Sequence, residues 1–454
     1  MVCRNWRETG PNFVQRAYNY DNSQEAATLW YHDHALGITR LNVYAGLAGF
    51  YLLRDDNEEN LIANNVLPSG PYEIGMAIQD RMFRANGRLF RPRRMRNCPP
   101  VRPIQHSGRV LWRLHPGQRH GLALPRCGAA QISLPPAQWL RFAFLHPETE
   151  QRPSLYGDWH GGRLPTAAVS VSEFWLMPGE RIDLVIDFST LNGQEIILQN
   201  FGPDSPFKGF GIDPPADPDT TGQIMQFRVN LPLGAVVPNA TVGATTALRT
   251  EPIPTLTPTA ARGVVLFEGM DAYGRLRPLV GMYHPDSALN QGSLAFTDPV
   301  TETPALNTSE VWEIYNTTED AHPVHLHLVQ FQVVNRQDFE FTLDVDPAGD
   351  GTGGTKFRLA NPVLTGSPEL PGPIESGRKD MVLALPGQVT RIKAHFDRPG
   401  RYMWHCHILS HEDHDMMRFF EVMDTGVTAA SVDDAEETNG SVLDKNVYIP
   451  IVAR

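Results

Sequence analysis

The chain has 454 residues, and its 39 lysines and arginines against 51 aspartates and glutamates give a formal net charge of −12. The length suffices for about three domains, and the acidic balance argues against a general nucleic-acid binder. No apolar run is long enough for a transmembrane helix, no secretory signal follows Met1, and the four cysteines suggest no disulfide framework.

The first candidate ligands are His32 and His34, which flank Asp33 near the start of the chain. On a β-strand, residues two apart point to the same face, so the two imidazoles can serve one metal site. A single His-x-His is more often a surface or packing pair, and this pair becomes informative only together with the later motifs.

The stretch between Asp80 and Glu148 is unusual, because it has thirteen arginines and no acidic residue. Most of it shows no alternation of apolar and polar residues. Three readings are open: an arginine-rich binding insertion, an unusual loop, or protein translated out of frame.

Short alternating runs follow, such as residues 169–174 and 181–188. With 38 glycines and 38 prolines in the chain, they favour β-sandwiches over helices. Residues 230–262 are rich in Pro, Thr and Ala and indicate a connector.

The strongest motif is the tripeptide His405-Cys406-His407. Aromatic and apolar residues at 402–404 indicate a strand, on which the two histidines share one face and Cys406 points to the other. Upstream, His322 lies three residues before the His-x-His pair at 325 and 327, so its imidazole is free to turn to the sulfur. The trigonal His₂Cys set of a blue copper site with a weak axial Met is therefore predicted at His322, Cys406, His411 and Met416.

Together these motifs resemble the multicopper oxidases, and residues 32–55 are similar to the branch of bacterial laccases, bilirubin oxidase and phenoxazinone synthase. The resemblance implies an all-β fold of three cupredoxin-like Greek-key β-sandwich domains. It also implies copper centres of types 1, 2 and 3 that carry electrons from a small aromatic reductant to dioxygen. The implied cluster ligands are His32, His34, His325, His327, His405 and His407.

The resemblance also gives two acidic residues a role in proton delivery, Glu412 next to His411 and Asp33 between two cluster histidines. For each, the alternative is hydrogen bonding to the ligands alone. The implied function is of laccase type, the one-electron oxidation of phenols, aromatic amines or bilirubin-like pigments coupled to reduction of dioxygen to water. Relatives are often secreted, periplasmic or part of the spore coat, and the sequence fixes neither compartment nor oligomeric state.

The sequence departs from the family in two places. The family builds its cluster from eight histidines, but no histidine precedes His32 in this chain. We therefore expect that the front of the first domain is absent, together with two of the cluster ligands. A one-base shift can turn plausible codons for residues 125–139 into LDVEPRKYRFRLLNG, the strand pair of the family at this place. We therefore expect about 91–160 to be out of frame and poorly ordered, without a metal site, and the activity of this chain to be impaired.

The predicted organisation has three domains, of which the first is incomplete and the second is partly disrupted. The predicted segments are 1–60 for the remnant of the first domain, 74–229 for the second, 230–262 for the connector, 263–424 for the third with its copper motifs, and 425–454 for a tail.

Three other functions are open at this point. A non-catalytic type 1 copper-binding or electron-transfer protein fits the complete blue-copper set. A copper nitrite reductase also joins two copper sites through a His-Cys pair, but the full motif around Cys406 favours the oxidase. A structural coat or interaction protein with incidental copper would not need Met416 and Glu412.

Resequencing the gene from upstream of Met1 through the codon of Leu164 tests both departures. We expect the reads to restore a His-x-His pair ahead of His32 and to return residues 109–160 to the frame of the family. Reads that reproduce the present sequence would mean that the locus encodes a decayed or repurposed copper protein.

Overall fold

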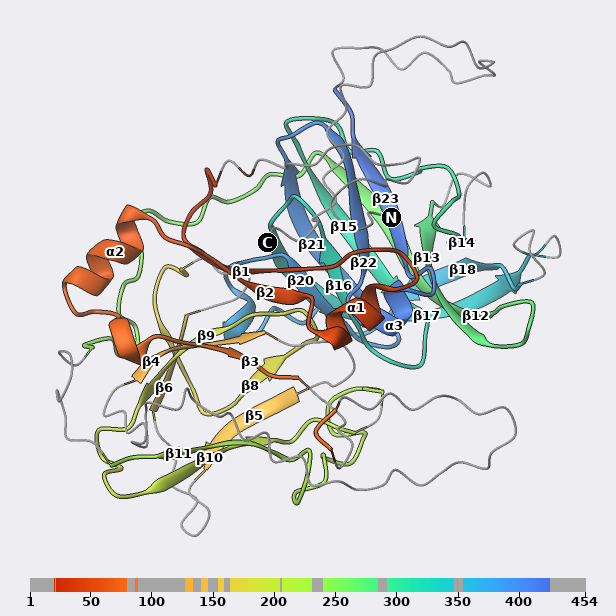
Figure 1. Ribbon diagram of the computed structural model, residues 1–454. Helices are drawn as coiled ribbons and strands as arrows, with labels where there is room; N and C mark the ends of the chain where they lie inside the picture. Colours follow the sequence, from red (N-terminus) through yellow and green to blue (C-terminus); the bar gives the residue numbers. More distant parts are fainter. Residues whose placement is uncertain are drawn as a thin grey trace, which may run out of the picture.

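Strands dominate the structure, a computed structural model, and the all-β prediction is confirmed (Figure 1). Three short helices and two 3₁₀ turns accompany the strands in the part of the chain that is described. None of these helices is long and apolar enough to cross a membrane. Described are residues 20, 22–79, 86–88, 164–204, 206–230, 240–284, 292–346, 349 and 354–424, and the backbone of 127–133, 140–145 and 154–158.

The first described elements form a hairpin that carries the first histidine pair. Strand β1 (Ala27–His32) pairs antiparallel with β2 (Ala48–Leu53), and helix α1 (Thr39–Ala45) lies in the connection between them. Helix α1 ends at Gly46, whose φ of 106° is the left-handed conformation common at helix C-termini. In Figure 1 this hairpin runs between the two β-sandwiches formed by the rest of the chain.

A second helix follows this hairpin, and the predicted connector pairs with the segment after that helix. Helix α2 (Asp56–Ala63) begins at Asp55, whose carboxylate accepts the backbone N–H of Glu58 at 2.8 Å. In the connector, the backbone N–H of Thr241 donates to the carbonyl of Asn65 at 2.8 Å. The described residues of the connector form no strand before Ala260.

The middle of the chain forms a sandwich of two sheets, one ordered β11-β10-β5-β8 and the other β3-β4-β9-β6-β7. A 3₁₀ turn (Gly70–Tyr72) leads into it. Its core contains the buried Phe174, Leu184, Ile196 and Leu198. The strands are β3 (Ile74–Ala77), β4 (Cys127–Ser133), β5 (Leu140–Leu145), β6 (Ser154–Asp158), β7 (Val169–Val171), β8 (Phe174–Leu176), β9 (Asp183–Asp187), β10 (Glu195–Asn200) and β11 (Gln223–Arg228).

Strands β4, β5 and β6 lie in the range of about 91–160 that was expected to be out of frame and poorly ordered. Their backbones pair with neighbouring strands of both sheets. The reading frame stays a prediction. Outside the described residues lie Cys98, His106, His115, His120, His146, His160 and the side chain of Cys127.

The C-terminal part forms a larger sandwich, in which a sheet ordered β14-β13-β12-β15-β21-β17-β18, with β19 beside β17, faces a sheet ordered β20-β16-β22-β23. A 3₁₀ turn (Pro373–Glu375) and helix α3 (Leu409–Glu412) complete it, and the predicted tail at 425–454 lies outside the described residues. The strands are β12 (Ala260–Met270), β13 (Leu276–Tyr283), β14 (Gly292–Leu294), β15 (Thr308–Asn316), β16 (His322–Leu326), β17 (Phe331–Val345), β18 (Phe357–Leu364), β19 (Arg378–Lys379), β20 (Met381–Ala384), β21 (Gln388–Phe396), β22 (Gly400–Cys406) and β23 (Met417–Val422).

Strand β12 is buried on both faces. Val264 and Leu266 belong to the core between the two sheets, whereas Val265 and Phe267 belong to a second cluster with Phe339 and Leu359 of the β17–β18 hairpin. A strand covered on both sides needs a continuous apolar run instead of an alternating one. The run of four apolar residues in β12 meets this requirement.

Replacement of Phe267 by alanine should leave a cavity in the second cluster and lower the free energy of unfolding of this sandwich by about 3 to 5 kcal/mol. The control is Met270→Ala at the end of the same strand, where the side chain is 49% exposed. This control should change stability by less than about 0.5 kcal/mol. Urea unfolding followed by tryptophan fluorescence measures both, and equal effects would contradict the double burial of β12.

Candidate metal centre

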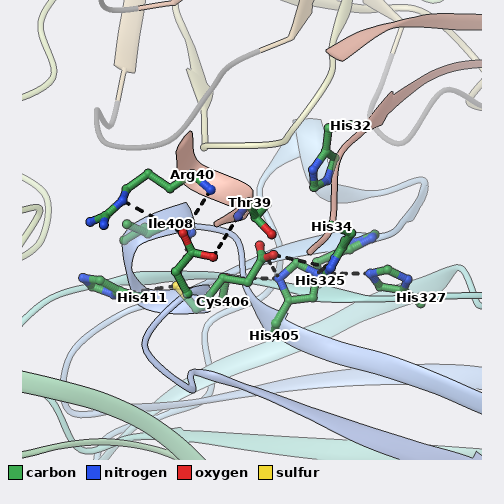
Figure 2. A network of polar contacts seen from close by, with 12 residues as sticks. His32, His34, Thr39, Arg40, His325, His327, His405, Cys406, Ile408 and His411 are labelled. Carbon is green, nitrogen blue, oxygen red and sulfur yellow. Dashed lines mark hydrogen bonds and ion pairs between the residues drawn. The ribbon is translucent and has the colours of Figure 1, made fainter. Parts of the chain in front are cut away.

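Strand β22 connects two clusters of metal-binding side chains. It pairs antiparallel with β16, so that Cys406 lies opposite Val324 and His405 lies opposite His325. Because neighbouring side chains on a strand point to opposite faces, the sulfur and the imidazole of His405 point to different sites. Figure 2 shows Cys406 beside His411, and His405 among the other histidines.

The first cluster surrounds the sulfur. Cys406 Sγ lies 3.5 Å from His322 Nδ1 and 3.9 Å from His411 Nδ1. Met416 is fully buried in the same core, and its carbonyl accepts the backbone N–H of Cys406 at 3.0 Å. The predicted blue-copper residues are therefore brought together, with two nitrogens and one sulfur within 4.8 Å of one another.

The second cluster is formed by the six predicted cluster histidines. His405 Nε2 lies 3.3 Å from His34 Nε2 and 3.1 Å from His327 Nε2. The ring centre of His407 lies 5.3 Å from that of His32 and 5.7 Å from that of His325. Residues of β1, β16 and β22 and of the turns that follow these strands thus meet in one place.

Backbone carbonyls orient three of these rings. The Nδ1–H groups are donated by His32 to Asp33 at 2.8 Å, by His325 to Asp380 at 2.7 Å and by His405 to Cys406 at 3.1 Å. A carbonyl only accepts, so the hydrogen is on Nδ1 and the lone pair is on Nε2. The lone pair of His405 Nε2 therefore faces two other imidazole nitrogens, an arrangement that fits metal ions between the rings.

Burial keeps the cluster imidazoles neutral. Desolvation lowers the pKa of His32 to about 4 and that of His34 to about 3, and it holds the pKa of His405 well below the usual value. Metal binding requires the neutral imidazole, so these rings need not lose a proton near pH 7. Burial also lowers the pKa of His322, His325, His327, His407 and His411.

The thiol of Cys406 behaves in the opposite way. Burial raises its pKa well above the usual value. A thiolate at this position needs a cation beside it, and a bound metal ion deprotonates a coordinating thiol. The donor set of one sulfur, two imidazoles and a thioether suits copper in its one-electron chemistry, so the residues fit the ion that the sequence predicts.

The two acidic residues singled out in the sequence lie in different surroundings. The carboxylate of Glu412 lies between two cluster rings, 3.5 Å from His34 Nδ1 and 3.3 Å from His405 Nδ1. Burial first, and the neighbouring Asp413 second, raise its pKa well above the usual value. Asp33 is half-buried and accepts from the side chain of Asn42 at 2.8 Å, so its carboxylate faces α1.

Sequence reasoning missed a hydroxyl and two carboxyl groups near His322. Thr318 Oγ1 lies 2.7 Å from His322 Nε2 and 2.8 Å from Asn316 Oδ1. Because the amide oxygen only accepts, a hydroxyl that donates to it accepts the Nε2–H of His322, whose Nδ1 lone pair then faces the sulfur. Glu268 and Asp320 approach the same ring, and burial followed by the charge of Asp320 raises the pKa of Glu268 to about 8.

A further missed residue is Asp413, which attaches α1 to the C-terminal sandwich. Its carboxylate accepts the backbone N–H groups of Thr39 at 3.1 Å and Arg40 at 3.0 Å. Thr39 and Asp413 are 374 residues apart in the sequence, so no local pattern indicates the contact. It holds the segment after His34 against the segment after His411.

Comparison with known proteins agrees with this geometry. Two family models described as multicopper oxidase match residues 11–58 and 279–426. A laccase of Bacillus stratosphericus is 38% identical to this chain, and the match covers 92% of this chain and 76% of the laccase. A bilirubin oxidase of Albifimbria verrucaria is 31% identical, with 89% of this chain and 62% of that protein covered.

A solved structure supports the fold. The McoA multicopper oxidase from Aquifex aeolicus superposes with a TM-score of 0.60 and 23% sequence identity, covering 88% of this chain and 76% of that chain. The predictions of cupredoxin-like sandwiches, copper and an enzyme are confirmed. The chain therefore belongs to the multicopper oxidase family and is a copper-dependent oxidoreductase.

Proposed function

We propose that the chain takes single electrons from small aromatic reductants, such as phenols, aromatic amines or bilirubin-like pigments, and uses them to reduce dioxygen to water. The observation that carries the proposal is that β22 bears a sulfur site on one face and a histidine cluster on the other. The laccase and bilirubin oxidase among its relatives support this substrate class.

The sulfur cluster is the proposed type 1 site, with His322, Cys406, His411 and Met416 as its ligands. The proposed ligands of the type 2 and type 3 centres are His32, His34, His325, His327, His405 and His407. Copper bound at the two places would supply one-electron transfer at the sulfur and multi-electron reduction of dioxygen at the imidazoles.

The ligands at the sulfur differ in access to solvent. His322 is fully buried, whereas His411 is half-buried. We assign His411 to the side where a reductant delivers its electron, since it is the least buried of the four proposed ligands. From Cys406, a single peptide unit leads in either direction to His405 and His407, so the backbone itself joins the two sites.

Glu412 is proposed as the group that holds a proton beside the cluster. Its carboxylate contacts Nδ1 of both His34 and His405. From this position Glu412 can hold a proton on a carboxyl oxygen and release it into the space between the His34 and His405 rings. Asp33 is proposed in a lesser role, as an acceptor that fixes the loop between His32 and α1.

Replacement of Cys406 by serine should abolish the blue absorption and reduce oxygen uptake with a phenolic reductant to background, because the thiolate is the coloured ligand. The control is His414→Ala, since this histidine is in the same segment but exposed. We expect the control to keep colour and turnover. A blue, active Cys406→Ser chain would show that the sulfur site is elsewhere.

Replacement of Glu412 by glutamine keeps the size of the side chain but removes its acid. We expect kcat for oxygen uptake to fall by about 100-fold, while copper content and blue absorption are unchanged. The control is Glu421→Gln on β23, where the carboxylate pairs with Arg401. Normal turnover per bound copper, with less copper bound, would instead assign Glu412 to ligand support alone.

A further inference from the structure

A turn of the middle sandwich reaches the histidine cluster. Residues 177–182 connect β8 to β9 and contain no histidine. Gly179 at the tip has a φ of +81°, and a Cβ there would lie 2.6 Å from Cγ of His407 and 2.7 Å from Cδ2. The backbone of this turn therefore lies directly against the His407 ring, and any larger residue at Gly179 would displace the ring or the turn.

The side chain of Arg181 joins three parts of the chain. It is only 2% exposed. Its Nε donates to the carbonyl of Thr28 on β1 at 3.0 Å, and its Nη1 donates to the carbonyl of Gly179 at 3.2 Å. Its two Nη groups also donate to the carboxylate of Asp380, at 3.0 and 2.6 Å. Such a two-point pairing fixes both the distance and the orientation of the partners.

Asp380 connects Arg181 to the histidine cluster. While its carboxylate is held by Arg181, its backbone carbonyl accepts Nδ1–H of His325 at 2.7 Å. The same carbonyl accepts the backbone N–H of Leu326 at 3.3 Å. The residue held by Arg181 thus sets which nitrogen of His325 faces the cluster.

A second ion pair joins the turn to the same segment of the C-terminal sandwich. Lys379, next to Asp380, donates from Nζ to the carboxylate of Glu180 at 2.5 Å, and both side chains are buried. The other carboxylate oxygen of Glu180 accepts the backbone N–H of Met177 at 3.0 Å. Two adjacent residues of the turn therefore pair with two adjacent residues of the C-terminal sandwich.

Strand β1 is held by the same region. Besides the bond from Arg181 to its carbonyl, Thr28 donates from Oγ1 to the carboxylate of Asp183 at 3.0 Å. Thr28 is on the strand that ends at His32. The turn and the start of β9 therefore reach three of the places from which cluster histidines come.

We propose that Gly179 and Arg181 are positioning residues for the histidine cluster. Gly179 sets the position of the His407 ring, and Arg181 sets the tautomer of His325 through Asp380 and the position of β1 through Thr28. The sulfur site has no contact of this kind with residues 179–181 among those described. This inference rests on the proposed ligand roles of the histidines.

The test uses the full chain loaded with copper, in the variants Arg181→Lys and Gly179→Ala. Lysine keeps the charge but cannot make the two-point pair, and alanine keeps every ion pair but presses on His407. We expect the blue absorption to persist while the type 2 electron paramagnetic resonance signal and the near-ultraviolet type 3 absorption decrease. Copper affinity at the cluster should fall by about 10- to 100-fold, measured as copper retained per chain after dialysis against a chelator.

Two control variants separate positioning from general damage. Arg262→Lys breaks a comparable two-point pair, with Glu310 at 2.8 Å, away from the histidines. Gly274→Ala puts alanine at a φ of +69° where a Cβ meets nothing within 4 Å. Both should lower stability and leave all copper signals in their normal ratio.

The outcomes are distinct. Unchanged cluster signals in both test variants, or a parallel loss of blue and cluster signals, would overturn the positioning role. If Arg181→Lys does not fold, Gly179→Ala alone decides, since it leaves the ion pairs intact. Absence of cluster signals from the unaltered chain would mean that these six histidines alone do not hold the cluster coppers, and the inference would fail together with the proposed ligand roles.

Discussion

The alternation of side chains along β22 is the constraint on which the structure depends. It places Cys406 on one face and His405 on the other, while the register with β16 sets His325 opposite His405. A shift by one residue would exchange every side chain between the two faces. Trp404 on the same strand is fully buried, and its ring centre lies 5.8 Å from that of Trp312 in the core. A shift would remove this indole from the core and is therefore opposed.

Burial of this strand also determines the chemistry of its side chains. The pKa of His405 is held well below the usual value, and that of Cys406 is raised well above it, both chiefly by desolvation. In a dry interior an imidazole is a ready ligand, whereas a thiolate is stable only beside a cation. Metal binding is therefore linked to folding, because the same packing that builds the core creates the need for positive charge at the sulfur.

Much of the candidate site could be predicted from the sequence, because most of its ligands come in short motifs at the ends of strands. The histidine pairs and the motif around Cys406 are local patterns, and the strand alternation that sorts them holds in the structure. The alternating runs favoured β-sandwiches over helices, whereas the cupredoxin-like architecture was implied by the family resemblance. The pairing of Arg181 with Asp380 spans 199 residues, and the capping of α1 by Asp413 spans 374. Such contacts depend on how whole sandwiches pack, which no local pattern encodes.

The two sites differ in how they are built. The sulfur site takes all its proposed ligands from the C-terminal sandwich, whose strands β16 and β22 are hydrogen-bonded neighbours. The histidine cluster also needs His32 and His34 from the N-terminal hairpin, and its His407 ring lies against the turn at Gly179 from the middle sandwich. Interfaces between domains are more polar than cores and open more readily. The cluster therefore depends on three parts of the chain staying together, whereas the sulfur site depends on one.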